Sequence, residues 1–348
     1  MKRAGIHKIA QLAKVSIGTV DRALHGRPGI SQSTRTKVLR IAKQLAYKPH
    51  PAARALSIGR APLRIGVCIP EEIHFFYDQM RAGIFDEANR VSGLGLDIVY
   101  RPVPRLGEDE KSRINDLLTS QVSAMIITPG DPKIVGPLIR RAENSGIRVV
   151  CTTTDAPRSR RSSVVSVDPK LSGKLAAELM TKFLVPGAQA AVVTGMLSTE
   201  EHRSKAQGFR EAFENGSGGK VVAVLEAHES EQESYRKTHT LLDRQPELLG
   251  IYVSTVNCLP VCRALQERKL GGKVRLITTD LFRQMIPYLE SGTIAASIYQ
   301  DPYLQGQTAV RILVDHFTRG AAIAPTCYLN PGIVLRSNIG LFREAARK

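Results

Sequence analysis

Apolar residues recur at helical spacing through the first part of the chain. Over residues 6–14 they fall three and four positions apart, which predicts a short helix. Ser16 is a natural N-cap for a second helix over residues 17–24. A third helix begins after Ser31 or Ser33, and its apolar residues again share one face. Because the first two helices are short and the turn between them is tight, the pattern predicts a helix-turn-helix.

From Leu63 onward the pattern changes to short apolar strands that alternate with amphipathic helices. The predicted strands are 63–69, 96–100, 124–128, 148–153, 163–167, 189–194, 221–227, 250–254, 273–278 and 295–298. The helices between them include 78–91, 134–145, 171–184 and 201–215. This alternation is typical of an α/β fold with mostly parallel sheets. Ten strands are more naturally two sheets than one, so we expect two Rossmann-like lobes that face each other across a cleft.

The composition is that of an ordinary globular protein, with 43% apolar and 23% charged residues. No apolar stretch approaches the length of about 18 residues that suggests a membrane span. Residues 5–14 are polar where a signal peptide would be apolar, so we expect a cytoplasmic protein with no membrane partner. Five cysteines, an odd number without paired spacing, are expected to be reduced core residues rather than disulfides or metal ligands.

The net charge of +17 is concentrated at one end. Residues 1–61 hold thirteen Lys and Arg against the single acid Asp21. A compact unit this basic is typical of a nucleic-acid-binding domain, because each cation near a phosphate releases condensed counterions. A solvated basic surface is the alternative.

In a helix-turn-helix the second helix enters the major groove with its N-terminal side chains at the base edges. The candidate DNA-binding residues there are Ser16, Ile17, Gly18, Thr19 and Arg22. Arg22 suits a bidentate contact to guanine, whereas Ile17 offers only apolar contact, as to a thymine methyl. We assign Ala10, Val15, Val20 and Ala23 to the core between the helices instead.

Motifs of catalysis are absent from the sequence. It has no phosphate-binding loop, dinucleotide fingerprint, HExxH metal motif or GxSxG elbow. We therefore expect no enzyme activity, no catalytic residue, no metal and no cofactor.

The run HKIAQLAKVSIGTVDRALHGRPGISQSTRTKVLRIAKQLAYKPHPAARAL, residues 7–56, resembles the DNA-binding headpiece of the lactose-repressor (LacI) family of bacterial transcription regulators. Two positions depart from the family pattern. Lys14 replaces a common turn glycine, which suggests a different turn geometry. Asp21 replaces a serine, and an acid there would repel a phosphate or brace a basic side chain such as Arg22.

The resemblance implies a hinge helix just after the headpiece. By this match Leu56 is a wedge at the central base step of the minor groove, with Ala53 beneath it and Arg54 near phosphate. The alternative is a plain linker whose leucine packs on the next domain. The predicted division is a headpiece at 1–47, a hinge and linker at 48–62, and a core at 63–348.

The core resembles the periplasmic sugar-binding-protein fold, and among its variants the ribose-binding type. The motifs that carry this resemblance are IGVCIP, HFFYDQMRAGIFDEA, IITPGDP, GIRVVCTTTDAP, SVDPKLSGKLAAELM, HRSKAQGFREAF and SIYQDPYLQGQTAV. It implies an N-lobe of about 63–167 and 300–330 and a C-lobe of about 168–299 and 331–348.

The resemblance also implies a sugar site at the carboxyl ends of the strands. The residues it assigns to that site are His74, Phe76, Tyr77, Asp131, Thr153, Asp155, Arg203, Asp280 and Gln300. Thr153 stands where the family has an aspartate, and Asp155 is a possible substitute. Phe76 as a core residue, Asp155 as a helix cap and Arg203 as a surface charge are the alternatives.

Together these features predict a repressor that leaves a palindromic double-stranded DNA operator when a sugar, polyol or derivative binds its cleft. A two-fold operator requires at least a homodimer, and a higher assembly is open. The same fold with the ligand as corepressor, or acting as an activator, is an alternative. A sugar receptor for transport is a more distant one, since it needs a signal peptide and no headpiece.

Overall fold

The computed structural model describes residues 6–24, 28–45 and 63–342. The chain forms two compact units, a headpiece and a core that begins at Leu63. The headpiece holds α1 (Ile6–Ala13), α2 (Ile17–Leu24) and α3 (Gln32–Gln44). Its buried core is formed by Ile9, Ala10, Ala13, Val20, Ala23, Val38 and Ala42. The predicted helix-turn-helix is therefore present, and Ser31 is the residue that caps α3, accepting a hydrogen bond from the amide of Thr34.

The turn between α1 and α2 depends on an unusual backbone conformation. Lys14 has φ of 54°, in the left-handed region that favours glycine. The amide of Val15 then returns to the carbonyl of Ala10 at 3.1 Å, which closes the turn. The lysine is thus accommodated at a glycine-like position.

The core contains two six-stranded sheets. The sheet of the N-lobe has the order β11-β5-β4-β3-β1-β2, and all its strands are parallel. Its strands are β1 (Arg64–Cys68), β2 (Asp97–Tyr100), β3 (Ala124–Ile127), β4 (Arg148–Thr152), β5 (Ser163–Val167) and β11 (Thr326–Leu329). The sheet of the C-lobe has the order β12-β10-β9-β8-β6-β7, and β12 alone in it is antiparallel. Its strands are β6 (Gln189–Thr194), β7 (Lys220–Glu226), β8 (Leu248–Val253), β9 (Arg275–Thr279), β10 (Ile294–Tyr299) and β12 (Gly332–Val334).

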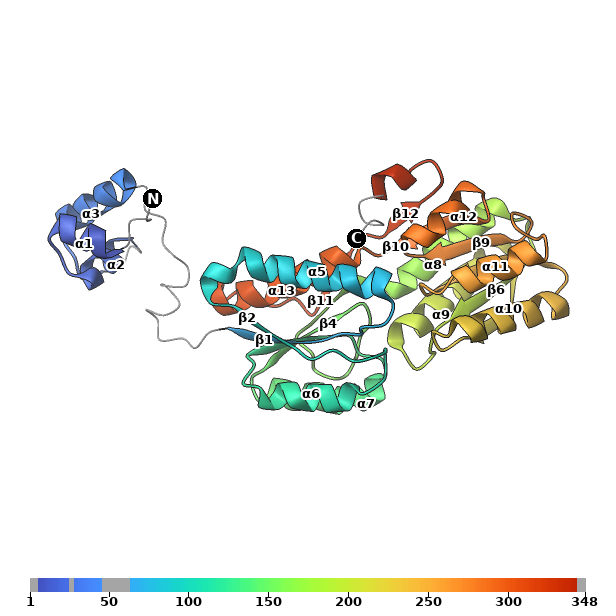
Figure 1. Cartoon of the computed structure of the whole chain (residues 1–348), viewed down its shortest axis with the longest axis horizontal. Helices are drawn as coiled ribbons and strands as arrows, with labels where there is room; N and C mark the ends of the chain where they lie inside the picture. Colours follow the sequence, from blue (N-terminus) through green and yellow to red (C-terminus); the bar gives the residue numbers. More distant parts are fainter. Residues whose placement is uncertain (1–5, 25–27, 46–62, 343–348) are drawn as a thin grey trace. The chain divides into compact units, whose positions relative to one another are not determined.

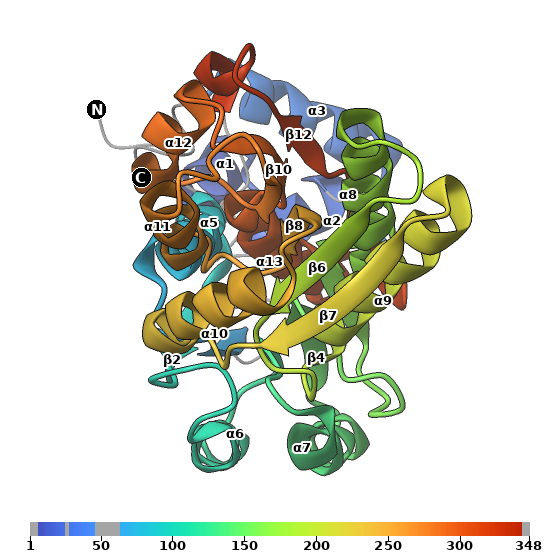
Figure 2. The same cartoon turned by 90° about the vertical axis from the view of Figure 1, so that its right-hand side faces the viewer.

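Helices cover both faces of each sheet (Figure 1). In the N-lobe, α5 (His74–Arg90) and α13 (Pro302–Arg319) cover one face, and α6 (Glu110–Thr119) and α7 (Pro132–Asn144) the other. In the C-lobe, α8 (Pro169–Phe183) and α9 (Glu200–Ser217) lie opposite α10 (Glu231–Arg244) and α11 (Leu259–Glu267) (Figure 2). The short α12 (Ile286–Glu290) precedes β10. The predicted class, a helical headpiece with a two-lobed α/β core of parallel sheets, is confirmed.

Glycines allow the two long helix pairs to pack closely. A Cβ at Gly83 on α5 would lie 2.1 Å from the carbonyl oxygen of Tyr303, and one at Gly306 on α13 would lie 2.3 Å from that of Met80. The pair α8 and α9 repeats this reciprocal arrangement at Gly173 and Gly208. Each helix pair is therefore in backbone contact at these positions.

The structure differs from the sequence prediction in several elements. Helix α5 begins at His74, four residues before the predicted start at residue 78, because its first turn is aromatic rather than amphipathic. The edge strands β11 and β12 were not predicted, since their residues, apart from Val334, are exposed or only partly buried. All five cysteines are free, but Cys327 on β11 is only partly buried. Among the described residues no helix is long and apolar enough to cross a bilayer.

Candidate functional site

The predicted recognition helix presents its candidate DNA-binding residues on one exposed face. The Ser16 hydroxyl accepts a hydrogen bond from the amide of Thr19 at 3.2 Å and pairs with the Thr19 hydroxyl at 2.9 Å, so it caps α2. Ile17 is 44% exposed, and Gly18 and Arg22 are also exposed. Side chains at the start of α2 are thus free to reach a nucleic acid.

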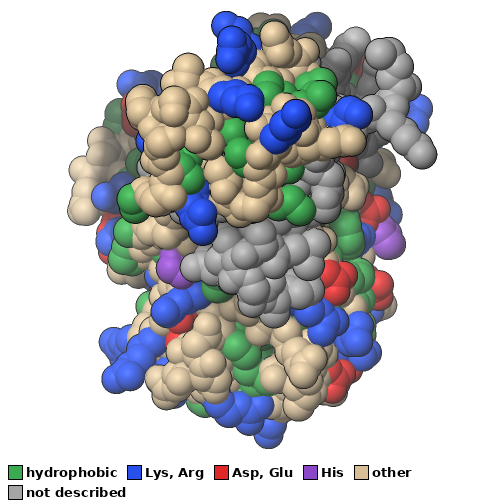
Figure 3. All heavy atoms as spheres, turned by 90° about the vertical axis from the view of Figure 1, so that its left-hand side faces the viewer, with side chains coloured by type: hydrophobic (Ala, Val, Ile, Leu, Met, Phe, Trp, Pro, Cys, Tyr) green, Lys and Arg blue, Asp and Glu red, His purple; other side chains and the backbone are tan. Residues whose placement is uncertain are grey.

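The rest of the described headpiece surface is basic. Lys8, Lys14, Lys37, Arg40 and Lys43 are all exposed. Figure 3 shows Lys and Arg side chains in blue on the face that it draws. Such a surface matches the phosphate backbone of DNA. The predicted hinge contacts Ala53, Arg54 and Leu56 lie outside the described residues.

A cavity that opens to solvent at its mouth lies between the two lobes of the core. It is found where the carboxyl ends of the strands meet, as expected for ligand sites in α/β folds. Its lining residues are Ile73, Phe76, Tyr77, Leu106, Thr153 and Thr154 of the N-lobe, Glu201, His202, Lys205, Glu229, Thr255 and Val256 of the C-lobe, and Gln300 at the crossover. The lining combines aromatic and aliphatic faces with hydroxyl, amide and charged groups, a combination suited to a small polar molecule.

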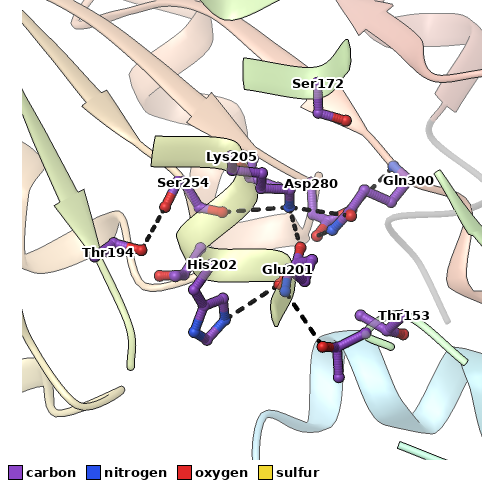
Figure 4. Close-up of polar contacts among 12 residues, drawn as sticks. Thr153, Ser172, Thr194, Glu201, His202, Lys205, Ser254, Asp280 and Gln300 are labelled. Atoms are coloured by element: carbon purple, nitrogen blue, oxygen red, sulfur yellow. Dashed lines mark hydrogen bonds and ion pairs between the residues drawn. The ribbon is translucent and has the colours of Figure 1, made fainter. Parts of the chain in front are cut away.

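Buried Lys205 organises the floor of the cavity from helix α9 (Figure 4). Its Nζ donates to the carbonyl of Ser254 at 3.3 Å and to Oε1 of Gln300 at 3.1 Å, and it forms an ion pair with Glu201. Burial, the largest single influence, acts against the ammonium charge, but Glu201, Tyr252 and Asp280 together outweigh it and raise the pKa of Lys205. Lys205 is therefore a charged, fully engaged residue.

Asp280 completes this network from the end of β9. Its carboxylate accepts hydrogen bonds from the backbone amide of Gln300 at 3.0 Å and from the Gln300 side chain at 2.8 Å. Burial raises the pKa of Asp280 to about 6, although Lys205 and the Gln300 bonds oppose the shift. Asp280 thus fixes the orientation of Gln300, which lines the cavity.

His202 links two carboxylates on the C-lobe side. Its Nδ1 accepts a hydrogen bond from the backbone amide of Met196 at 2.9 Å, so the ring proton is on Nε2. Nε2 lies 3.3 Å from a carboxylate oxygen of Glu201 and 3.3 Å from one of Glu229. Burial raises the pKa of Glu229, and the neighbouring Glu201 adds to that shift.

The lobes are joined by direct contacts around the cavity. The Thr199 hydroxyl donates to the carbonyl of Gly130 at 2.7 Å, and the amide of Glu201 donates to the Thr154 hydroxyl at 3.3 Å. The rings of Phe75 and Phe282 stack with centroids 3.9 Å apart. A molecule in the cavity is therefore enclosed by both lobes at once.

A buried carboxyl lies behind one of these contacts. Oε1 of Glu110 accepts hydrogen bonds from the amides of Gly130 at 2.7 Å and Gly107 at 3.0 Å. Burial raises the pKa of Glu110 to about 7, although these two amide bonds oppose the shift. Glu110 thus holds the glycine whose carbonyl receives Thr199.

Strained backbone is concentrated at this end of the strands. Ile73, Thr153, Glu229 and Asp280 all have φ between 54° and 65°, in the left-handed region. This conformation costs a non-glycine residue about 1–2 kcal/mol. Such residues cluster at functional sites more than elsewhere.

The structure brings together five of the nine predicted ligand residues. Phe76, Tyr77, Thr153 and Gln300 line the cavity, and Asp280 is bonded to Gln300 directly behind it. The Thr153 hydroxyl donates to Gln305 at 3.1 Å.

The other four predicted residues lie away from the cavity. His74 on α5 has an 80% exposed side chain, and Asp131 caps α7 by accepting from the amide of Lys133. Asp155 forms an ion pair with Arg161 at 2.5 Å. Arg203 is 49% exposed and pairs with Glu200 on its own helix, as a surface charge would.

Sequence reasoning missed Glu201, His202, Lys205 and Glu229. The apolar residues of α9, Ala206, Phe209 and Phe213, mark its buried face. Extended by helical spacing toward the N-terminus, that face includes His202 and Lys205 and leaves Arg203 outside. The helical periodicity of α9 was therefore the signal that would have assigned Lys205, rather than Arg203, to the cavity. No pattern marked Glu229, which lies in a loop.

Comparisons with known proteins agree with this architecture. Residues 65–321 match the family model described as periplasmic binding protein domain, and residues 5–50 match that of bacterial regulatory proteins of the lacI family. Catabolite control protein A of Priestia megaterium is 25% identical over 323 residues, which are 90% of this chain and 92% of that protein.

Solved structures share the fold of the core. One is a solute-binding protein of an ABC transporter from Burkholderia graminis in complex with D-arabinose, with a TM-score of 0.73, 24% identity, and coverage of 80% of this chain and 96% of that one. Another, from Bacillus halodurans with bound myo-inositol, has a TM-score of 0.74, 18% identity, and coverage of 82% and 98%.

A helix-turn-helix headpiece together with a two-lobed core that encloses a cavity defines a DNA-binding regulator whose core is built like a periplasmic binding protein. The chain belongs to the periplasmic binding protein domain family over its core, and its headpiece is a domain of the lacI family of bacterial regulatory proteins.

Proposed function

We propose that this regulator is a cytoplasmic homodimer, without enzymatic activity, that represses transcription from a near-palindromic operator and is released when a sugar, polyol or derivative binds between its lobes. The observation that carries the proposal is the enclosed cavity, because both lobes contribute side chains to it. The solved structures of similar fold with bound D-arabinose and myo-inositol support the ligand class.

The geometry supports coupling between the ligand and the arrangement of the lobes. A ligand that contacts Tyr77 on one side and Glu201 on the other stabilises the closed arrangement over the open one. A change in lobe orientation at a dimer interface alters the distance between the paired DNA-contacting segments. The affinity for DNA then changes by the same factor as the affinity for the ligand.

A two-stage experiment tests this proposal. Operator sequences are first selected from random DNA with the full chain, and affinity is measured by fluorescence anisotropy with and without each member of a sugar and polyol panel. Reduced affinity with one panel member supports induction, and increased affinity assigns a corepressor instead. Unchanged DNA affinity with every ligand that binds removes the coupling. Sedimentation as a monomer at micromolar protein, both free and on DNA, contradicts the dimer.

A further inference from the structure

Glu229 is a carboxyl group of the cavity wall whose interactions are incomplete. Its side chain is only 10% exposed, and Oε1 lies 3.3 Å from Nε2 of His202. Its other oxygen, Oε2, is buried and has no hydrogen-bond partner within the described part of the chain. A buried carboxylate oxygen without a partner is costly, so a ligand in this cavity that supplied a donor to it would be stabilised.

Among the described residues that line the cavity, no cation is free to pair with Glu229. Lys205 already contacts Ser254, Gln300 and Glu201. His202 is engaged as well, because its Nδ1 accepts the amide proton of Met196 and its Nε2 lies 3.3 Å from both Glu201 and Glu229. Glu201 and Glu72 add negative charge near Glu229. His202 and Lys205 act in the opposite direction, but both are already bound to other groups, so the carboxylates Glu201, Glu229 and Glu72 lie close together with Lys205 engaged elsewhere.

The backbone places Glu229 at this point at an energetic cost. His228 and Glu229 have φ of 49° and 54°, two successive residues in the left-handed region. A Cβ at Gly195 would lie 2.1 Å from Oε1 of Glu229, so the approach of this carboxylate depends on a glycine. The loop that carries Glu229 is also held at its start, since the backbone amide of Ala227, directly after β7, donates to the carbonyl of Thr194 at 2.8 Å. Strained backbone that holds a carboxylate at a cavity is typical of a functional site.

We propose that the effector carries a protonated nitrogen that binds Glu229, which makes it an amino sugar or aminated polyol rather than a neutral or phosphorylated sugar. This inference rests on the proposed function, because it names the ligand class of the same cavity. An ammonium group donates a charge-assisted hydrogen bond to the unpartnered oxygen and neutralises the excess charge. The phosphate of a phosphorylated sugar would be repelled by these carboxylates, and no free cation among the described lining residues would bind it. Phosphorylated sugars are therefore excluded as effectors by this proposal.

Matched pairs of ligands test the proposal by isothermal titration calorimetry on the full chain. D-Glucosamine, D-galactosamine and D-mannosamine are compared with glucose, galactose and mannose at pH 6.5, where the amines are protonated. We expect at least one amino sugar to bind tenfold or more tightly than its parent hexose. The N-acetylated sugars retain the nitrogen without its charge, so we expect them to bind no more tightly than the parent hexoses. This comparison uses the unaltered protein.

The variant Glu229→Gln keeps the size of the side chain and removes its charge. We expect it to reduce the preference for the amino sugar to threefold or less. Glu231→Gln is the matched control, because Glu231 lies two residues away with a 68% exposed side chain outside the cavity. Equal melting temperatures of the three proteins establish that they are folded.

The outcomes separate this inference from the proposed function. Neutral hexoses that bind as tightly as their amino counterparts, or a preference unchanged in Glu229→Gln, overturn the inference and leave a sugar effector in place. Absence of binding by every member of both series overturns the sugar-type effector as well.

Discussion

At the scale of single residues, the ion pair between Glu201 and Lys205 dominates the cavity. Both side chains are at least 94% buried, so neither charge is well solvated. We predict that Lys205→Met lowers the free energy of unfolding of the core by about 3–5 kcal/mol, because it leaves buried carboxylates without a counter-ion. Differential scanning calorimetry of the full chain at pH 7.5 measures this change.

The double variant Lys205→Met, Glu201→Gln is the control for that prediction. Removal of both charges leaves no unpaired ion, so we expect it to recover most of the lost stability. A double variant as unstable as Lys205→Met alone would show that lost packing, not charge, is responsible.

Glu110 gives a prediction about pH. Its pKa of about 7 in the folded core lies above the ordinary 4.5, so the folded state retains a proton that the unfolded chain has already lost. Its contribution to stability therefore falls as pH rises from about 4.5 to 7, by about 3 kcal/mol in total. We predict that Glu110→Gln, which cannot ionise, gains stability relative to wild type over this range.

The measurement is the melting temperature of each protein between pH 5 and pH 8. Glu108→Gln serves as the control, since Glu108 is exposed in the preceding turn. Parallel curves for wild type and Glu110→Gln would contradict the assignment.

The sequence alone identified only some of the residues of the cavity. Phe76, Tyr77 and Gln300 were placed at the cavity by the resemblance to the ribose-binding type, and all three line it in the structure. The same resemblance assigned Arg203, whereas the helical face of α9 selects Lys205. Glu229 was beyond prediction, because two left-handed residues orient it and neither is a glycine.

At the scale of elements, the glycine contacts between long helices are the feature with the clearest consequence. A Cβ at Gly208 on α9 would lie 2.3 Å from the carbonyl oxygen of Lys170. We predict that Gly208→Ala forces α8 and α9 apart and lowers the free energy of unfolding by about 1–3 kcal/mol. Because α9 carries Lys205, we also expect weaker ligand binding by calorimetry.

Gly216 on the same helix provides the control. A Cβ there meets nothing within 4 Å, so Gly216→Ala is expected to stabilise the helix by up to about 1 kcal/mol. Equal melting temperatures for Gly208→Ala and wild type would show that the helices repack without cost.

Element type was predicted more reliably than element extent. Long periodic helices and buried strands gave clear patterns, and the two-lobed class followed from their alternation. The edge strands β11 and β12 were missed because their residues, apart from Val334, are exposed or only partly buried, so neither strand has a buried apolar run.

At the scale of the whole molecule, operator recognition depends on the exposed face of α2. We predict that Arg22→Ala weakens operator binding by about 1–3 kcal/mol and relaxes the base preference at one position of each half-site. Lys37→Ala on α3 is the comparison, since loss of a phosphate contact weakens all sequences alike and lowers the salt dependence. Anisotropy titrations over a series of salt concentrations distinguish the two, and identical effects of both variants would remove Arg22 from base recognition.

The order of the strands has a consequence for how this protein is made. Helix α13 and strand β11 complete the N-lobe, and β12 completes the C-lobe, although the chain has built most of both sheets before residue 300. A chain emerging from the ribosome therefore exposes the face of α5 that α13 later covers until synthesis passes residue 319. Both lobes complete their sheets only when β11 and β12 have been synthesised, so we expect the nascent chain to expose unpaired strand edges and apolar surface of the kind that chaperones protect.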